Sequence, residues 1–283
     1  MRIFECVVVL AACAMAAEKP SRELIVCGWD EVFILDMAAT PPAKVWSWKA
    51  PEQYRDQFKS TDDCKPVDGG SKILISSSSD GIALVDRKTR KMLFHAAAGG
   101  AHSIEFLPKG RIAVAASTSD RPLNNSLVIF DLKRPERPLF VDELRNGHGV
   151  VWDGKRQVLW AMGGRVLRQY RLDPALKKVK EFTLPDDDGH DLMAIPHSEL
   201  LSLTTHHSAW VFDRDTENFA PHPQLAGKEN VKCITVHPKT GEMVWTQADP
   251  GFWWTATLRF LNPEGTHELA GQRLYKARWV DVP

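Results

Sequence analysis

The chain has 283 residues and a formal net charge of zero, with 36 basic and 36 acidic side chains. This balance argues against a binder of nucleic acid or of a membrane surface, because both kinds of protein concentrate positive charge. The length allows either two domains or one large all-β unit. Three of the five cysteines, Cys27, Cys64 and Cys233, follow the N-terminal leader, and an odd number without close spacing does not make a disulfide framework.

The first segment, residues 1–17, has an early base, an apolar run from Cys6 to Met15, and small residues at Ala14 and Ala16. We interpret it as a cleaved export signal, since the run is too short to span a bilayer. Its stretch from Leu10 to Cys13 also resembles a bacterial lipobox, which would leave Cys13 as a lipid anchor. We therefore expect a secreted or periplasmic protein, with an outer-membrane lipoprotein as the alternative. No later segment is apolar enough to cross a membrane.

From residue 18 onward, an apolar run ending on an acid or amide recurs six times, at a period of roughly 40 to 50 residues. The closing residues are Asp36, Asp86, Asp131, Asp173, Asp213 and Asn262. Each run follows another short apolar run and precedes a more polar one, with turn-forming residues between them. In four copies a further run comes first: AHSIEFL, GHGVVWD, GHDLMAIP and VKCITVHP. Four short strands at this period predict the blade of a β-propeller, with the first strand nearest the axis. The segment Pro51–Phe58 is the main candidate for a helix.

The two ends of the chain complete one blade between them. The N-terminal region supplies three strands, near Glu23–Cys27, Val32–Met37 and Lys44–Trp48, and the C-terminal RLYKARWVDV supplies a first strand. Pairing these ends closes the ring and protects the strand edges. The alternative, two stacked β-sandwiches, explains neither the repeated register nor the missing strand. The sequence therefore predicts an all-β, six-bladed propeller over residues 18–283, with four antiparallel strands in each blade.

The start of each first strand should lie near the axis, on the same face as the loop between the second and third strands. Counting back from the second strands places histidines at equivalent positions in three consecutive blades, followed by lysines in the next two. These residues are His102, His148, His190, Lys232 and Lys276. In the second blade either Asp63 or Lys65 fits this position. We expect the three imidazoles to face one axial cavity.

Imidazole is a common ligand of divalent metals, and an open three-histidine site leaves room for a substrate. We therefore expect a divalent ion (Mn, Zn or Ca). The facing Lys232 and Lys276 would repel it unless an anion lay between, which favours an acidic ligand such as a uronic acid. Two alternatives remain open. The histidines can bond neighbouring backbone and plug the channel, or contact the ligand and transfer protons without a metal.

Loops on the same face add polar and aromatic side chains: His206 and His207 in TTHHSAW, and Gln247, Trp253 and Trp254 in TQADPGFWWT. Exposed indoles and polar groups together suit a sugar. His206 and His207 are the candidates for proton transfer, although only one of two adjacent residues on an extended segment should face the axis. The expected substrate contacts are Lys65, Lys232, Lys276, Trp253, Trp254 and Arg278, the last of these placed deeper. The acidic run Asp186–Asp188 either reaches a cation or forms a solvated loop.

With the histidine ring and the Gln247 loop, the arrangement resembles that of the oligogalacturonate lyases. The resemblance implies an axial divalent metal held by His102, His148, His190 and Gln247, and cleavage of uronate-containing oligosaccharides by β-elimination. The chain departs from that family in having six blades rather than seven, so the resemblance covers architecture and site type. It is also similar to secreted bacterial propellers of uncharacterised function found beside carbohydrate-degrading enzymes.

Together these features predict an extracytoplasmic, metal-assisted lyase or hydrolase that acts on an acidic saccharide at the axis. The alternative is a non-catalytic propeller that binds a glycan or a protein partner through the same face. None of the motifs GxSxG, HExxH, GxGxxG or the P-loop occurs in the chain, so the common hydrolase, zinc-protease and nucleotide-binding signatures are excluded.

Overall fold

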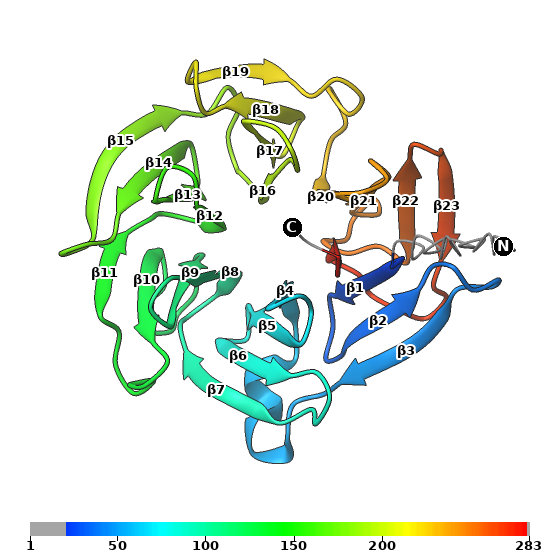
Figure 1. Ribbon diagram of the computed structural model, residues 1–283, viewed down its shortest axis with the longest axis horizontal. Helices are drawn as coiled ribbons and strands as arrows, with labels where there is room; N and C mark the ends of the chain where they lie inside the picture. The colour runs from blue at the N-terminus through cyan, green and yellow to red at the C-terminus, as the bar shows by residue number, and fades with distance from the viewer. Residues whose placement is uncertain (1–20, 282–283) are drawn as a thin grey trace, which may run out of the picture.

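The computed structural model describes residues 21–281, which form six four-stranded antiparallel sheets around a central axis (Figure 1). This confirms the predicted six-bladed propeller, and the alternative of two stacked sandwiches is wrong. The proposed export signal at residues 1–17 and the lipid anchor at Cys13 lie outside the described residues. Within residues 21–281, no helix is long and apolar enough to cross a membrane.

The ring closes as the sequence predicts, because the last strand of the chain joins the first three in one sheet. That sheet contains, in order, β24 (Lys276–Trp279), β1 (Glu23–Cys27), β2 (Val32–Asp36) and β3 (Ala43–Trp48). In the pairing of β24 with β1, Ile25 lies opposite Arg278 and Cys27 opposite Lys276. Residues from the two ends of the chain thus form the innermost strands of this blade.

The other five blades each use four consecutive strands, running outward from the axis. The second blade is β4 (Thr61–Val67), β5 (Lys72–Ser77), β6 (Gly81–Asp86) and β7 (Met92–Ala97). The third is β8 (Ala101–Leu107), β9 (Arg111–Ala116), β10 (Ser126–Asp131) and β11 (Phe140–Glu143). The fourth is β12 (Gly147–Asp153), β13 (Val158–Gly163), β14 (Val166–Arg171) and β15 (Lys177–Thr183). The fifth is β16 (Asp191–Ala194), β17 (Leu200–Thr204), β18 (Ala209–Asp213) and β19 (Asn218–Pro221). The sixth is β20 (Val231–Val236), β21 (Met243–Gln247), β22 (Thr257–Leu261) and β23 (Gly265–Glu268).

The repeated aspartate at the end of the third strand has a local cause. The Asp86 carboxylate accepts a hydrogen bond from the backbone N–H of Thr89, and the Asp213 carboxylate accepts one from Thr216. Such a bond from an aspartate to the backbone two or three residues later forms a tight turn and directs the chain into the fourth strand. The sequence repeat therefore marks the hairpin between the third and fourth strands.

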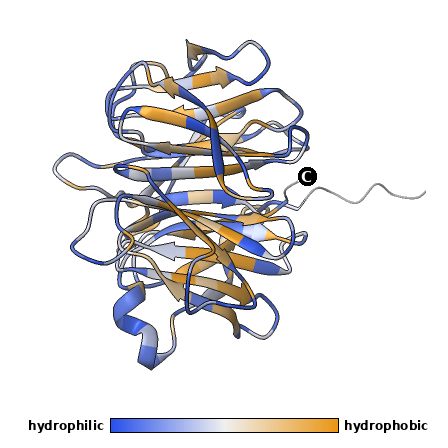
Figure 2. Ribbon diagram, turned by 90° about the vertical axis from the view of Figure 1, so that its left-hand side faces the viewer, coloured by the Kyte–Doolittle hydropathy of each residue, from blue (hydrophilic) through white to orange (hydrophobic). Residues whose placement is uncertain are grey.

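The hydrophobic core is divided into layers between neighbouring blades. One layer joins Phe94 of the second blade to Phe130 of the third, with ring centroids 6.2 Å apart, and another joins Trp160 of the fourth to Phe212 of the fifth at 5.4 Å. Figure 2 shows the apolar residues concentrated along the strands and the polar ones in the loops. Since each blade packs only against its neighbours, the axis itself is left to polar side chains.

The predicted helix over Pro51–Phe58 is present as a short 3-10 helix, η1 (Glu52–Phe58), which lies outside the second blade (Figure 1). Only Phe58 of this helix is buried, and its ring meets Trp48 edge-on at 5.3 Å. This helix therefore seals the outer joint between the first two blades and lies far from the axis.

Candidate functional site at the hub

Four of the first strands contain a β-bulge at the same position, near the start of the strand. The register shifts on either side of Asp62 in β4, His102 in β8, His148 in β12 and Lys232 in β20. A bulge leaves one extra residue unpaired and re-aims its side chain, which is why bulges recur beside functional sites. Repetition of this irregularity in four blades is what turns these polar side chains toward the axis.

The bulge also corrects the sequence-based assignment in the second blade. The ring position there is Asp62, not Asp63 or Lys65, because its bulge is equivalent to those at His102 and His148 and lies one residue before the position reached by counting from the apolar Ile73. A carboxylate oxygen of Asp62 lies 3.6 Å from Nε2 of His102 in the next blade. Burial raises the pKa of Asp62, and His102 partly offsets this effect. Asp62 and His102 thus form a close carboxyl–imidazole pair on the wall of the cavity.

The polar side chains near the starts of the first strands line a cavity of about 510 Å³ at the hub. Its walls include Asp62, His102, His148, His190, Lys232 and, at one side, Trp253 with Tyr275 behind it. The imidazole centroids of His102 and His148 are 4.3 Å apart, and those of His148 and His190 are 5.5 Å apart. The structure therefore brings together the three histidines that the sequence placed at equivalent blade positions.

Hydrogen bonds to the backbone set the tautomer of two of these imidazoles. His102 Nδ1 donates to the carbonyl of Gly100 at 2.8 Å, and His148 Nδ1 donates to that of Asn146 at 2.9 Å. The Nε2 atom of each ring therefore keeps its lone pair in the neutral form. Burial lowers the pKa of His148 well below its usual value, and the neighbouring His102 and His190 lower it further. His148 is consequently a neutral acceptor at physiological pH.

His190 has a different hydrogen-bond partner, which is Lys232 of the next blade. The ammonium of Lys232 donates to His190 Nε2 at 3.0 Å, while His190 Nδ1 is buried without a hydrogen-bond partner. Burial and the adjacent Lys232 lower the pKa of His190 well below its usual value. Burial likewise lowers the pKa of Lys232 to about 8. At neutral pH the pair therefore holds one positive charge, on the lysine.

Two of the predicted substrate contacts instead support the floor of the site. Lys276 is fully buried, and its ammonium donates to the carbonyl oxygens of His102 and His148 at 3.2 and 3.3 Å. It also lies 3.3 Å from a carboxylate oxygen of Asp191. Arg278 is 1 % exposed and bridges Asp63 to Asp191. The structure thus places both residues beneath the cavity, where they join strands of different blades.

Lys65 lies toward the other end of the first strands. Its ammonium donates to Glu105 at 2.9 Å and to the Val150 carbonyl at 2.7 Å, and it borders a separate cavity of about 320 Å³. That cavity is also lined by residues from the far ends of the first strands, such as Pro66 and Val236. Lys65 is therefore not brought to the same cavity as the histidines.

The residues predicted on the sixth blade separate into two groups. Trp253 is 43 % exposed, lines the hub cavity and meets Tyr275 at 5.7 Å between ring centroids. Trp254 packs instead against Phe252 at 4.7 Å. The side-chain amide of Gln247 donates to the Glu229 carbonyl at 2.9 Å, and Gln247 does not line the hub cavity. The structure therefore brings Trp253 to the site but leaves Trp254 and Gln247 at its margin.

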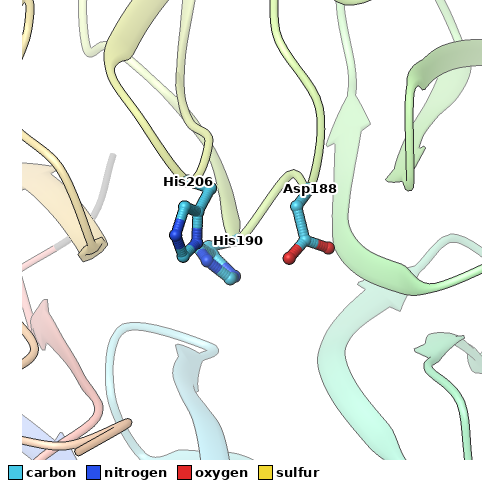
Figure 3. Close-up of side chains that lie close together, drawn as sticks. All are labelled: Asp188, His190 and His206. Atoms are coloured by element: carbon cyan, nitrogen blue, oxygen red, sulfur yellow. The ribbon is translucent and has the colours of Figure 1, made fainter. Parts of the chain in front are cut away.

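The loop histidines lie over the fourth and fifth blades, beside the acidic run. His206 has its ring 6.1 Å from that of His190, and both His206 and His207 line a groove of about 780 Å³ with Asp187 and Asp188. Asp188, His190 and His206 point toward one another in Figure 3, with one ligand atom of each within 4.8 Å of the others. A second group with this spacing is Asp186, Asp187 and His207.

The ligand set implied by the resemblance to oligogalacturonate lyases does not fit these residues. Within residues 21–281, His102 and His148 belong to no group of three metal-ligating side chains with this close spacing, and Gln247 is turned to the backbone. Three residues of this region were not identified from the sequence: Asp62, Tyr275 and Asn146, whose side-chain amide donates to the carboxylate of Asp188. Counting from Lys72, where β5 begins, and not from the apolar Ile73 would have indicated Asp62.

A comparison with curated proteins gives no match to this chain. A protein-family model matches residues 19–282, nearly the whole length of the chain. The chain therefore belongs to the family described as "Family of unknown function (DUF6528)".

Proposed function

We propose that this protein binds an acidic saccharide in the hub cavity and cleaves it there, in an extracytoplasmic compartment. The observation that carries the proposal is the set of side chains that line the hub cavity. A single lysine, Lys232, supplies the positive charge, neutral imidazoles supply hydrogen-bond acceptors, and Trp253 supplies an aromatic face. The volume of about 510 Å³ lies within the range of small-molecule sites, about 300–1,000 Å³.

Each part of this cavity matches one part of a uronate. The ammonium of Lys232 pairs with the carboxylate through a charge-assisted hydrogen bond. Neutral His148, whose Nε2 keeps its lone pair, supplies the acceptor for a proton of the bound sugar. The exposed ring of Trp253 stacks on the C–H face of the sugar. A neutral saccharide would leave the lysine without its counter-charge, so the cavity favours an acidic one.

The same groups suffice for a β-elimination. His148 Nε2 takes the proton next to the carboxylate, and the electron pair left behind forms a carbon–carbon double bond as the bond to the glycosidic oxygen breaks. The pair Asp62–His102 returns a proton to that oxygen. Lys232 stabilises the negative charge that develops on the substrate carboxylate. The reaction needs no further reactant, because all atoms come from the substrate and the two proton-transfer groups.

A screen of uronate-containing oligosaccharides, followed by the ultraviolet absorbance of the unsaturated product, tests this proposal. We expect absorbance to rise with at least one acidic substrate and the rate to fall by about 100-fold or more in His148→Ala, as for loss of a general base. His197→Asn changes an exposed histidine that contacts the Pro238 carbonyl outside the cavity, and it should keep the full rate, since asparagine tolerates the positive φ of 56° at this position. Hydrolysis without unsaturated product would contradict the elimination step but retain the substrate.

A non-catalytic binding function is the second candidate, and one observation favours it. Trp29, Phe252 and Trp253 are all exposed, and the guanidinium of Arg273 lies 4.1 Å over the ring of Trp29. Exposed aromatic side chains of this kind are typical of surfaces that bind a glycan or a protein. Saccharide binding without any turnover, unchanged in His148→Ala, would support this function over cleavage.

A further inference from the structure

A group of three side chains with metal-ligating atoms lies between the hub cavity and the groove over the fourth and fifth blades. His190 lines the hub cavity, whereas Asp188 and His206 line the groove over the fourth blade. Figure 3 shows the carboxylate of Asp188 and the two imidazoles turned toward a common space. One ligand atom of each lies within 4.8 Å of the other two. An ion held here would be accessible from both cavities.

The donor set decides which class of ion fits. Two imidazoles and one carboxylate suit first-row transition metals such as Zn²⁺ and Mn²⁺, whereas Ca²⁺ requires oxygen ligands. Ligands at about 2.1 Å from one ion lie roughly 3.0–3.4 Å from each other, so a pair at the 4.8 Å limit would have to close by about 1.4–1.8 Å. His206 can supply this movement, because it is half-buried on the loop between β17 and β18. Three protein ligands also leave at least one position open.

The carboxylate of Asp188 is already oriented by its neighbours. Asn146 donates from its side-chain amide to one oxygen of Asp188, and Ser117 donates to the amide oxygen of Asn146 at 2.6 Å. The backbone N–H of Asn146 is bonded in turn to Asn125 at 2.8 Å. Hydrogen bonds of this kind fix the ligating carboxylates of metal sites, since they leave the other oxygen directed at the ion.

The second ligand has a nitrogen without a partner. His190 is 7 % exposed, and its Nδ1 has no hydrogen-bond partner, whereas its Nε2 is bonded to Lys232. Buried polar atoms of this kind are rare, and an absent ion is one of the few reasons for them. The carboxylate of Asp188 also raises the pKa of Lys232, against the larger effect of burial. It therefore lies close enough to offset the repulsion between the ammonium and a cation.

We propose that Asp188, His190 and His206 hold one divalent transition-metal ion at the junction of the hub cavity and the groove, with His190 binding through Nδ1. This set differs from the one expected from the resemblance, since it contains neither His102, His148 nor Gln247. The role of the ion rests on the proposed function. Its open position would bind the carboxylate or a hydroxyl of the acidic saccharide beside Lys232.

Titration of Zn²⁺ or Mn²⁺ alone into chelator-treated protein, followed by calorimetry and by the metal content after dialysis, tests the site without any saccharide. We expect one equivalent to bind. The affinity should fall by about 100-fold or more in His206→Ala and in Asp188→Asn, which exceeds the 10- to 100-fold cost of losing a residue that merely orients a ligand. Asparagine tolerates the positive φ of 60° at position 188, so that variant should keep the fold. His197→Asn, at an exposed histidine outside both cavities, should bind the ion as the wild type does.

Two outcomes would overturn the proposal. The first is absence of stoichiometric binding of either metal to the wild type. The second is binding that survives both substitutions at Asp188 and His206 but is lost in His148→Ala or His207→Ala, which would assign the ion to the histidine ring or to the group of Asp186, Asp187 and His207. Neither outcome bears on the acidic saccharide, because the saccharide screen measures product and this titration measures metal.

Discussion

Replacement of Arg278 by methionine should strongly destabilise the propeller, although Arg278 is a single residue of the last strand. Its guanidinium makes four hydrogen bonds of 2.6 to 3.2 Å, two to Asp63 of β4 and two to Asp191 of β16. All three side chains are at most 2 % exposed. This bridge joins the first, second and fifth blades across the axis.

The expected magnitude follows from what the substitution leaves behind. Asp63 and Asp191 would remain buried with only Ser103, Lys276 and the more distant Lys65 as side-chain partners. Removal of one partner from a buried ion pair costs about 3–5 kcal/mol of unfolding free energy. At roughly 2–4 °C per kcal/mol for a domain near this size, the melting temperature should fall by about 6–20 °C.

Thermal and urea unfolding of the chain without residues 1–17, followed by circular dichroism, measure this change. Arg171→Met is the matched control, because Arg171 is exposed at the end of β14 and its loss should change the free energy of unfolding by less than about 0.5 kcal/mol. If Arg278→Met unfolds within that margin of the wild type, the hub network does not stabilise the fold and the reasoning is refuted.

Three further predictions concern the hub, the ring closure and the metal ligands. Burial alone would raise the pKa of Asp63, but Arg278 and the nearby lysines outweigh it and hold this pKa well below its usual value. The contribution of Asp63 to stability should therefore be complete above about pH 4, the pKa of an aspartate in the unfolded chain, and should be lost as the pH falls below it. The free energy of unfolding should consequently depend less steeply on pH in Asp63→Asn than in the wild type. Equal pH dependence of the two would contradict this. Trp279→Ala should cost about 3–5 kcal/mol in urea unfolding, because this buried indole of β24 packs the first blade against the sixth and donates to the Glu242 carbonyl. A loss below about 1 kcal/mol would argue against the closure. Asn146→Ala should weaken Zn²⁺ binding by about 10- to 100-fold in calorimetry through loss of the bond that orients Asp188, and unchanged affinity would exclude that role.

The fold could be predicted because its signals are local. Aspartates such as Asp86 and Asp213 accept hydrogen bonds from the backbone of the turn that follows them, so each hairpin leaves a mark in the sequence wherever it lies in space. The ring closure was equally accessible, because a blade that lacks one strand at the N-terminus must find it elsewhere. These features depend on residues a few positions apart, and the sequence displays them directly.

The site could be predicted only in part, since the missing information concerns distances across the axis. Equal spacing from the second strand identified His102, His148 and His190. In the second blade the second strand begins at the polar Lys72, one residue before its first apolar residue, so the same count falls on Asp63 and misses Asp62. The backbone carbonyls that Lys276 contacts belong to the third and fourth blades, so nothing near that lysine in sequence indicates its burial.

The central proposal is that the hub cavity selects an acidic saccharide through Lys232, and a binding comparison tests it most directly. Calorimetric titrations at pH 7, below the pKa of about 8 for this lysine, would compare a uronate oligosaccharide with its neutral counterpart. We predict that the wild type binds the acidic form about 10- to 100-fold more tightly, as expected for one charge-assisted hydrogen bond, and that Lys232→Met abolishes the difference. Equal affinity for the two saccharides, or a preference that persists in Lys232→Met, would contradict the proposal.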